Sequence, residues 1–265
     1  MPNSIRSAIV RTLSLFFVIW SIFGPIDSSL IEFKTILFGP SLLNGISFLF
    51  FLKFCLIFSS IALVLQPRSL WLGLIQLIAG SLLLYVGLVS NSVWNYNTHI
   101  IVIALLTYIT GLRGSEAGEK DLVTCVSLVF ATIYIQAAIS KVAVSGLDWM
   151  NTGLTIYRHL LKFNPTLSAI LDGNPILFQM AGWLTVIGEL VLGSFFAIPK
   201  TRKLAAMLSI SFHIMLWFAF NISFWHLWIF YPALYFSQNR NSFLARLNIQ
   251  DSICKSRMGL TSKQL

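Results

Sequence analysis

The sequence predicts an all-α protein, a polytopic transmembrane helical bundle of about eight helices. Three observations lead to this prediction: the composition is strongly apolar, the apolar residues fall into runs of membrane-spanning length, and the basic residues collect in alternate connections. Of 265 residues, 57% are hydrophobic and 10% are charged, whereas about a quarter of an ordinary soluble domain is charged. A water-soluble fold of this size would lack the polar surface to cover such a core, so lipid is the expected solvent.

The apolar runs give the element order. A bilayer core takes about 20 apolar residues per helix, and eight stretches meet or approach that length. Helix-breaking residues separate many of them: Gly24-Pro25, Gly39-Pro40, Gln66-Pro67, Asn174-Pro175 and Pro199. No small-residue cleavage site follows the first run, so we expect a retained helix there. The predicted spans are 7–24, 45–65, 69–90, 98–112, 121–143, 175–198, 203–221 and 223–238.

The basic residues favour this count and set the orientation. With the N-terminus inside, thirteen Lys and Arg fall on inner segments, three fall on outer loops, and Lys53 and Lys141 lie within spans. This asymmetry agrees with the positive-inside rule. We therefore expect a multi-pass protein of the cell inner (plasma) membrane with both termini cytoplasmic, ending in a short basic cytoplasmic tail at 239–265. The outer cations are Lys34, Arg158 and Lys162; the inner ones are Arg6, Arg11, Arg68, Arg113, Lys120, Lys200, Arg202, Lys203, Arg240, Arg246, Lys255, Arg257 and Lys263.

Two classes of partner are not expected. The net charge of +9 could suggest nucleic acid, but the basic residues do not cluster with interleaved aromatics as a nucleic-acid face requires. The three cysteines, Cys55, Cys125 and Cys254, are far apart and form no Cys-x-x-Cys pair. We therefore expect no nucleic-acid partner, no disulfide framework and no metal.

Ionisable side chains within the predicted spans are the candidate functional groups, because a charge at membrane depth is costly. They are Lys53, Lys141, Glu189 and His213, with His99 at the start of a span. The predicted topology places this set toward the extracytoplasmic half, as in a pocket that opens outward. Structural alternatives stay open: Glu189 could pair with a buried lysine such as Lys53, and His213 could hydrogen-bond a neighbouring helix.

Three stretches of the sequence combine aromatic, polar and ionisable residues. They are Trp94-Asn95-Tyr96-Asn97-Thr98-His99; residues 133–141 followed by Asp148-Trp149, Gly153 and Tyr157; and Phe212-His213 with Phe230-Tyr231-Pro232. These stretches resemble the transmembrane domain of the vitamin K-dependent gamma-glutamyl carboxylases, the HTTM family. The second stretch, which contains Lys141, is the most specific, and the resemblance extends loosely over most of residues 1–238. We accordingly expect residues 1–238 to form one HTTM-like transmembrane domain.

The resemblance implies a site. Lys141 would be the base toward a reduced, vitamin K-like quinone and His99 its helper, while the residues lining the cofactor pocket would be Glu189, His213, Trp149 and Asn95. A lysine can serve as a base when it loses its proton. A quinone with a lipid tail can enter such a pocket from the bilayer.

The chain also resembles the SdpB-like bacterial membrane proteins needed to produce a sporulation-delaying peptide toxin. These also have an Ile-Gln pair before the lysine, here Ile135-Gln136, and a Gly and a Tyr after the Trp. The resemblance implies a small peptide substrate and an accessory protein, because the predicted outer loops are too short for the docking region of the carboxylases. Three functions are compatible with these features: quinone-dependent modification or maturation of a small peptide, a non-catalytic membrane factor for production of or immunity to a peptide toxin, and a small transporter using Lys53 and Glu189.

Overall fold

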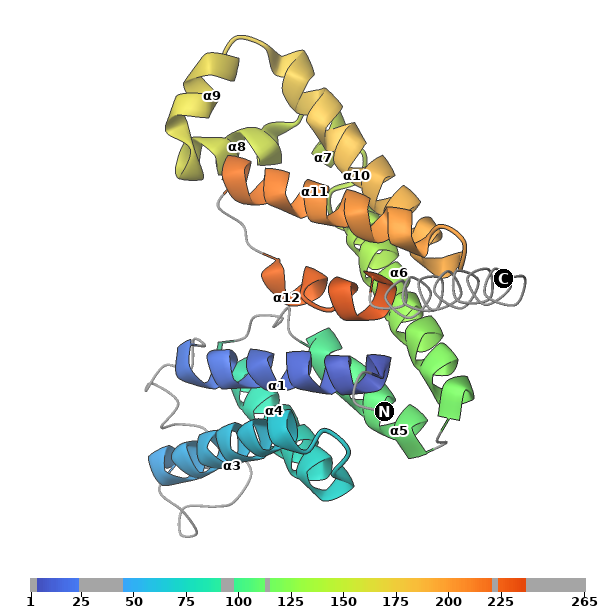
Figure 1. The fold of residues 1–265 in the computed structure, drawn as a ribbon. Helices are drawn as coiled ribbons and strands as arrows, with labels where there is room; N and C mark the ends of the chain where they lie inside the picture. The colour runs from blue at the N-terminus through green and yellow to red at the C-terminus, as the bar shows by residue number, and fades with distance from the viewer. Residues whose placement is uncertain (1–3, 24–44, 92–97, 113–114, 221–223, 237–265) are drawn as a thin grey trace, which may run out of the picture.

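The structure, a computed structural model, describes residues 4–23, 45–91, 98–112, 115–220 and 224–236, and these residues form helices with no β-strand among them (Figure 1). The all-α class is thus confirmed for the described part of the chain. In chain order the elements are α1 (Ile5–Phe23), α3 (Gly45–Leu65), α4 (Leu70–Asn91), α5 (Thr98–Leu112), α6 (Ser115–Ser145), α7 (Asp148–Asn151), α8 (Leu154–Phe163), α9 (Pro165–Leu171), α10 (Pro175–Ala197), α11 (Arg202–Phe220), α12 (Trp225–Trp228) and the π-helical turn η2 (Pro232–Phe236).

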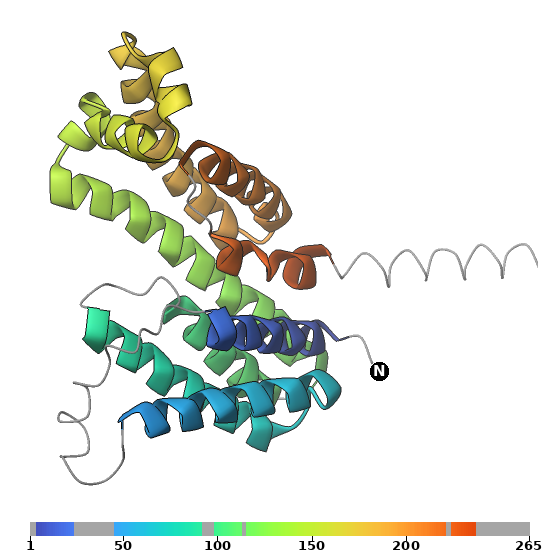
Figure 2. The same cartoon turned by 90° about the vertical axis from the view of Figure 1, so that its left-hand side faces the viewer.

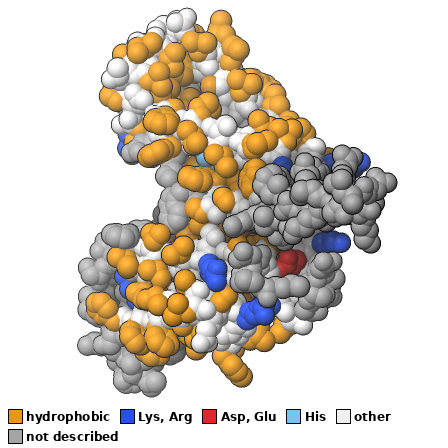
Figure 3. All heavy atoms as spheres, in the orientation of Figure 1, with side chains coloured by type: hydrophobic (Ala, Val, Ile, Leu, Met, Phe, Trp, Pro, Cys, Tyr) orange, Lys and Arg blue, Asp and Glu red, His pale blue; other side chains and the backbone are white. Residues whose placement is uncertain are grey.

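Four of the described helices are long and apolar enough to cross a membrane. They are α1, α6, α10 and α11, and shorter apolar stretches lie at Phe50–Leu65, Leu70–Tyr85 and Thr98–Leu112. Hydrophobic side chains cover much of the described surface, as Figure 3 shows for one face. Large ones stand far out from the protein, such as Phe218 at 73% exposure and Leu184 at 67%. An apolar exterior of this kind is solvated by lipid, and the protein is a helical membrane protein.

Seven of the eight predicted spans coincide with helices, and the eighth is wrong. The described part of this span, residues 224–236, does not form one helix but the single turn α12 and then η2. The break follows from Pro232, which has no N–H and whose ring clashes with the carbonyl four residues earlier. That carbonyl belongs to Trp228, the last residue of α12. The structure also adds three short helices, α7 to α9, where only a polar outer segment was expected.

The first four helices form one group, in the lower half of Figure 1. A buried polar clamp joins them. The side-chain amide of Gln76 on α4 donates to Ser14 on α1 at 3.2 Å and to Ser60 on α3 at 2.9 Å. Its carbonyl accepts from the hydroxyl of Tyr108 on α5 at 2.6 Å. Interhelical hydrogen bonds of this kind fix the pairing of helices that lipid does not drive together.

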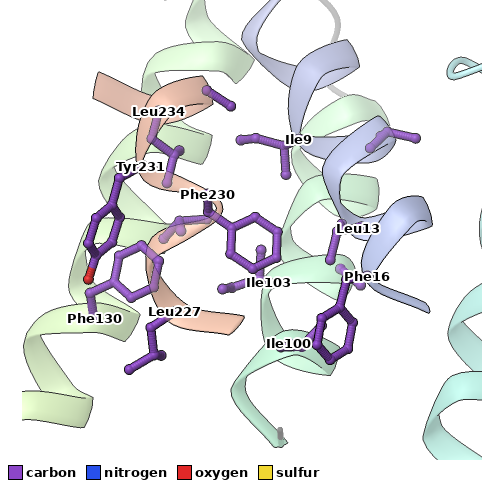
Figure 4. Close-up of a cluster of buried hydrophobic side chains, with 14 of the residues drawn as sticks. Ile9, Leu13, Phe16, Ile100, Ile103, Phe130, Leu227, Phe230, Tyr231 and Leu234 are labelled. Atoms are coloured by element: carbon purple, nitrogen blue, oxygen red, sulfur yellow. The ribbon is translucent and has the colours of Figure 1, made fainter. Parts of the chain in front are cut away.

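The α12–η2 segment lies between this group and α6. In Figure 4, Phe230 faces Ile9 and Leu13 of α1 and Ile103 of α5. Tyr231 points to the other side, where its ring meets Phe130 of α6 edge-on at 5.0 Å between centroids. Phe230 and Tyr231 are fully buried. The last predicted span is therefore part of the core between the two halves of the protein.

Helix α6 connects the two halves and is the longest, with 31 residues. It runs diagonally through the molecule in Figure 2 and packs against α5 and α10. Gly193 of α10 allows a close approach, because a Cβ there would meet Ile135 Cγ1 at 2.6 Å and the Ala131 carbonyl oxygen at 2.9 Å. The helix ends before Gly146, whose φ of 60° is left-handed, a conformation common just after a helix.

Candidate functional site

An ion pair joins α6 and α10. The ammonium of Lys141 lies 2.7 Å from both carboxylate oxygens of Glu189. It also donates to the Ala137 carbonyl at 3.2 Å, so all three of its N–H donors have an acceptor. The Glu189 side chain is 9% exposed and that of Lys141 is 23% exposed. The carboxylate is thus enclosed by protein, while the lysine keeps access to the surroundings.

The indole of Trp149 completes this group. Its ring centroid lies 5.6 Å from the Lys141 ammonium, within range of a cation–π contact. Trp149 is held through its neighbour Met150, which packs with Ala138 of α6 and Val186 of α10 in a small buried cluster. Ala138 is covered in this way, whereas Ala137 is half-buried and Ser140 is exposed. A ring-shaped ligand such as a quinone would therefore have to approach this stretch of α6 on the side of Ala137 and Ser140.

Two glycines let the α7–α8 segment approach α10 closely. A Cβ on Gly182 would meet the Met150 Cα at 3.0 Å, and one on Gly153 would meet the Phe178 carbonyl carbon at 2.4 Å. Gly153 also has a φ of 61°, in the left-handed region that glycine tolerates best. Together these contacts fix the height at which Trp149 stands over the ion pair.

A second polar cluster lies further along α6. The Tyr134 hydroxyl is hydrogen-bonded to Ser209, lies 2.6 Å from Nε2 of His213, and lies 3.3 Å from the Tyr231 hydroxyl. Ser209 and Tyr231 are in turn 3.0 Å apart. All four side chains are buried, and the ring of Tyr134 stacks on Phe196 at 5.7 Å.

The two clusters share the same pair of helices at two depths. Tyr134 and Lys141 are seven residues apart on α6, nearly two full turns, so they lie on one face about 10 Å apart. Phe196 and Glu189 have the same spacing on α10 and pair with them in antiparallel order. The polar residues of this face of α6 therefore belong to two groups. One is the ion pair, and the other, called the inner cluster below, is the hydroxyl–imidazole cluster of Tyr134, Ser209, His213 and Tyr231.

The predicted site residues divide into three groups. Lys141, Glu189 and Trp149 come together in the ion-pair group, and His213 lies in the inner cluster. His99 stands in the first turn of α5. Because α5 has 15 residues and α6 has 31, and the two pack as an antiparallel hairpin, His99 lies beside the middle of α6, roughly 20 Å short of Lys141 along the helix. Asn95 lies outside the described residues.

The predicted alternative of a Lys53–Glu189 pair is wrong, and one cluster was missed. Lys53 is on α3, and the structure pairs Glu189 with Lys141, not with Lys53. Tyr134, Ser209 and Tyr231 were missed as a cluster. One signal for Tyr134 was present: Ser127, Tyr134 and Lys141 recur at intervals of seven along α6, which places three polar groups on one face.

Comparisons with protein-family models, with curated proteins and with solved structures found no match to this chain.

We expect Tyr134→Phe to lower the free energy of unfolding by about 1.5 kcal/mol, because one hydroxyl serves three buried partners and interhelical hydrogen bonds contribute about 0.6 to 1.7 kcal/mol. Thermal unfolding of the purified protein in detergent measures this. Tyr157→Phe is the matched control, since the Tyr157 ring packs edge-on against Phe178 at 5.2 Å and would keep that contact. An equal loss in both variants would contradict a role for the inner cluster in stability.

Proposed function

We propose that this chain modifies or matures a small peptide, using a reduced quinone drawn from the bilayer, and that Lys141, Glu189 and Trp149 form the pocket. The observation that carries the proposal is the ion pair itself. A carboxylate and an ammonium stand under an indole in an apolar helical protein, where ionisable groups are rare and usually functional. Such a pair can exchange a proton at membrane depth, which chemistry on a lipid-soluble ring requires.

The residues present fit a flat aromatic ligand. The face of Trp149 offers a stacking surface, and Ser140 of α6 is exposed beside Lys141. On α10, a Cβ at Gly188 would meet nothing within 4 Å, so the helix surface at this glycine is open. When bound, a reduced quinone supplies an acidic hydroxyl and reducing equivalents.

The chain's own groups divide the work in this proposal. Glu189 would first accept the Lys141 proton on a carboxylate oxygen, which would leave Lys141 as a neutral amine. Lys141 would then take the proton of the quinol hydroxyl, as the base that the family resemblance implies, and the ammonium so formed would stabilise the negative charge left on that oxygen. His213 would support the pocket from the inner cluster through Tyr134. His99 stands apart from this arrangement and would act through another group.

One observation favours the non-catalytic alternative. All three Lys141 donors are already used by Glu189 and the Ala137 carbonyl, as in a structural ion pair. A membrane factor for production of, or immunity to, a peptide toxin would need no more than that. A quinone-binding experiment separates the two functions.

We expect a quinone without a lipid tail, such as menadione, to quench the fluorescence of Trp149 at saturable, micromolar concentrations. The chain has eight tryptophans, so the signal from Trp149 is taken as the difference between the wild type and Trp149→Phe. Trp183→Phe is the matched control, because Trp183 lies on α10 and is 41% exposed. Quenching that is linear in quinone and the same in all three proteins would rule out the pocket.

The proposal places the protein in the inner (plasma) membrane with its ion pair in the extracytoplasmic half and both termini cytoplasmic, which requires the broken α12–η2 segment to be the last crossing. We expect Cys254 to react with a membrane-impermeant thiol reagent only after the cells are opened. Cys254 lies outside the described residues, and the expectation comes from the distribution of Lys and Arg. Labelling of Cys254 in intact cells would reverse the orientation.

We also propose an accessory protein. Three short helices, α7 to α9, connect α6 with α10, and this connection is smaller than the docking region that the carboxylase resemblance implies. A peptide substrate would then be delivered by a separate chain or through the membrane.

A further inference from the structure

Helix α8 has an apolar side that packs against α10 and an opposite side that is basic and exposed. Ile156 and Leu160 are buried and pack with Phe178 of α10. On the other side, Arg158 and Lys162 are exposed and lie four residues apart, one above the other. They are two of the three basic residues expected on outer loops, so most of the outer positive charge is collected on this single face.

No described residue neutralises this charge. Neither Arg158 nor Lys162 forms a hydrogen bond or ion pair with a residue that the structure describes. The Lys162 ammonium lies 5.0 Å from the ring centroid of Phe163. The nearest acidic residues in sequence are Asp148, before α8, and Asp172, which accepts a hydrogen bond from the Gly173 amide at 3.2 Å.

Exposed apolar side chains lie on α8 and on the helices that pack against it. On α8 itself, Leu154 is 44% exposed and Leu161 is 47% exposed. On α9, α10 and α11, which contact α8, the exposed fractions are 70% for Ile170, 65% for Ile176 and 73% for Phe218. Water would not favour this surface, and cations beside exposed apolar groups are typical of the boundary between headgroups and acyl chains.

The position of α8 in the fold agrees with such a boundary. It follows the end of α6 and precedes the start of α10. The Asn164 side chain, at the end of α8, donates to the Phe218 carbonyl near the end of α11 at 3.4 Å. The ends of three membrane-crossing helices therefore meet at α8, as the upper part of Figure 1 shows.

We propose that α8 lies in the headgroup layer of the membrane, where Arg158 and Lys162 bind the phosphate of anionic phospholipids. The guanidinium of Arg158 suits the phosphate oxygens, and the Lys162 ammonium adds a second charge one turn away. This proposal does not depend on the chemistry of Lys141 and holds for any of the candidate functions.

The test uses the purified full-length protein in a neutral detergent, titrated with phosphatidylglycerol or phosphatidylcholine. Lipid that binds the folded state raises the unfolding temperature in proportion to its affinity. We expect stabilisation by phosphatidylglycerol beyond that by phosphatidylcholine. The double change Arg158→Gln and Lys162→Gln should weaken binding and raise the half-saturating concentration of phosphatidylglycerol roughly 30-fold, because each cation near an anionic surface contributes about fivefold.

Two control variants keep the result specific. Arg158→Lys with Lys162→Arg retains both charges and should keep most of the effect. Arg11→Gln with Lys200→Gln removes two exposed cations from other helical regions and should leave the α8-dependent part unchanged. Unfolding without lipid should be the same for all variants, because the changed side chains are exposed.

Three outcomes would overturn the proposal. The first is an unchanged phosphatidylglycerol effect in the Arg158→Gln, Lys162→Gln protein. The second is an equal effect of inorganic phosphate, which would mean binding of a free anion. The third is stabilisation by a soluble glutamate-rich peptide but not by phosphatidylglycerol, which would assign this face to a protein partner.

Discussion

Replacing Glu189 by glutamine is expected to lower the free energy of unfolding by about 3 kcal/mol. Removing one partner of a buried ion pair leaves the other charge uncompensated, which costs roughly 3 to 5 kcal/mol. The lower end of that range applies because the Lys141 side chain keeps 23% exposure. Lys141→Met should cost at least as much, since it leaves the more deeply buried carboxylate alone. Chemical unfolding in mixed micelles measures both losses.

The double variant separates stability from function. Lys141→Met with Glu189→Leu removes both charges, and replacement of a whole buried pair by apolar groups is often neutral. We therefore expect the double variant to regain most of the stability that each single change loses. If the pair is part of the quinone pocket, this double variant should still lose quinone quenching of Trp149, although its stability is regained. Retained quenching would show that the pair serves only the fold.

Lys141→Arg tests the base. Arginine keeps the charge and can hold Glu189, but it does not give up its proton. We expect this variant to accumulate normally in the membrane and to lose activity. The readout is a secreted peptide whose mass appears only in cells that carry the protein. If Lys141→Arg produces that peptide at the wild-type level, Lys141 is a fixed charge and the enzymatic proposal fails.

Gly153→Ala is expected to be the most damaging single-methyl change in the site region. The new Cβ would meet the Phe178 carbonyl carbon at 2.4 Å, and that atom belongs to the backbone of α10 and cannot move aside as a side chain could. A non-glycine residue in the left-handed region costs about 1 kcal/mol or more, and overpacking adds about 1 to 3 kcal/mol. We expect a total loss of about 3 kcal/mol, measured by unfolding.

Gly146→Ala is the matched control for this change. Gly146 has nearly the same φ, 60° against 61°, but a Cβ there would meet nothing within 4 Å. Its loss should be only the conformational cost, about 1 kcal/mol. The difference between the two variants measures the contact of α8 with α10. Gly153→Ala should also displace Trp149 and weaken quinone quenching, whereas Gly146→Ala should preserve it. Equal losses would show that the close approach to Phe178 has little importance.

Local features of the sequence were enough to predict most helices. The breaks at Gln66-Pro67, Asn174-Pro175 and Pro199 stand at helix boundaries in the structure, because proline acts on its own turn and the one before it. The same rule explains the break at Pro232, although this proline lies within an apolar run long enough to predict a span. The short helices α7 to α9 were missed because their apolar runs are too short to indicate a span.

The site was predicted in part. Lys141 and Trp149 were expected in one site because the family resemblance implied it, and the structure brings them together. That Glu189 would bind Lys141 could not be read from either residue, since it depends on the antiparallel register of α6 and α10. Close packing of Gly193 and Gly182 against their neighbours accompanies that register.

The sequence by itself determined that this protein is a helical membrane protein, because apolar length and charge density are properties of each segment alone. It also determined which ionisable groups would be costly and therefore informative. The tertiary structure decided which of these groups meet. It pairs Lys141 with Glu189, sets His213 beside Tyr134, and leaves His99 on another helix. In lipid, burying an apolar helix surface against another helix brings little hydrophobic gain, so close packing and interhelical hydrogen bonds, not the hydrophobic pattern, determine which helices pair.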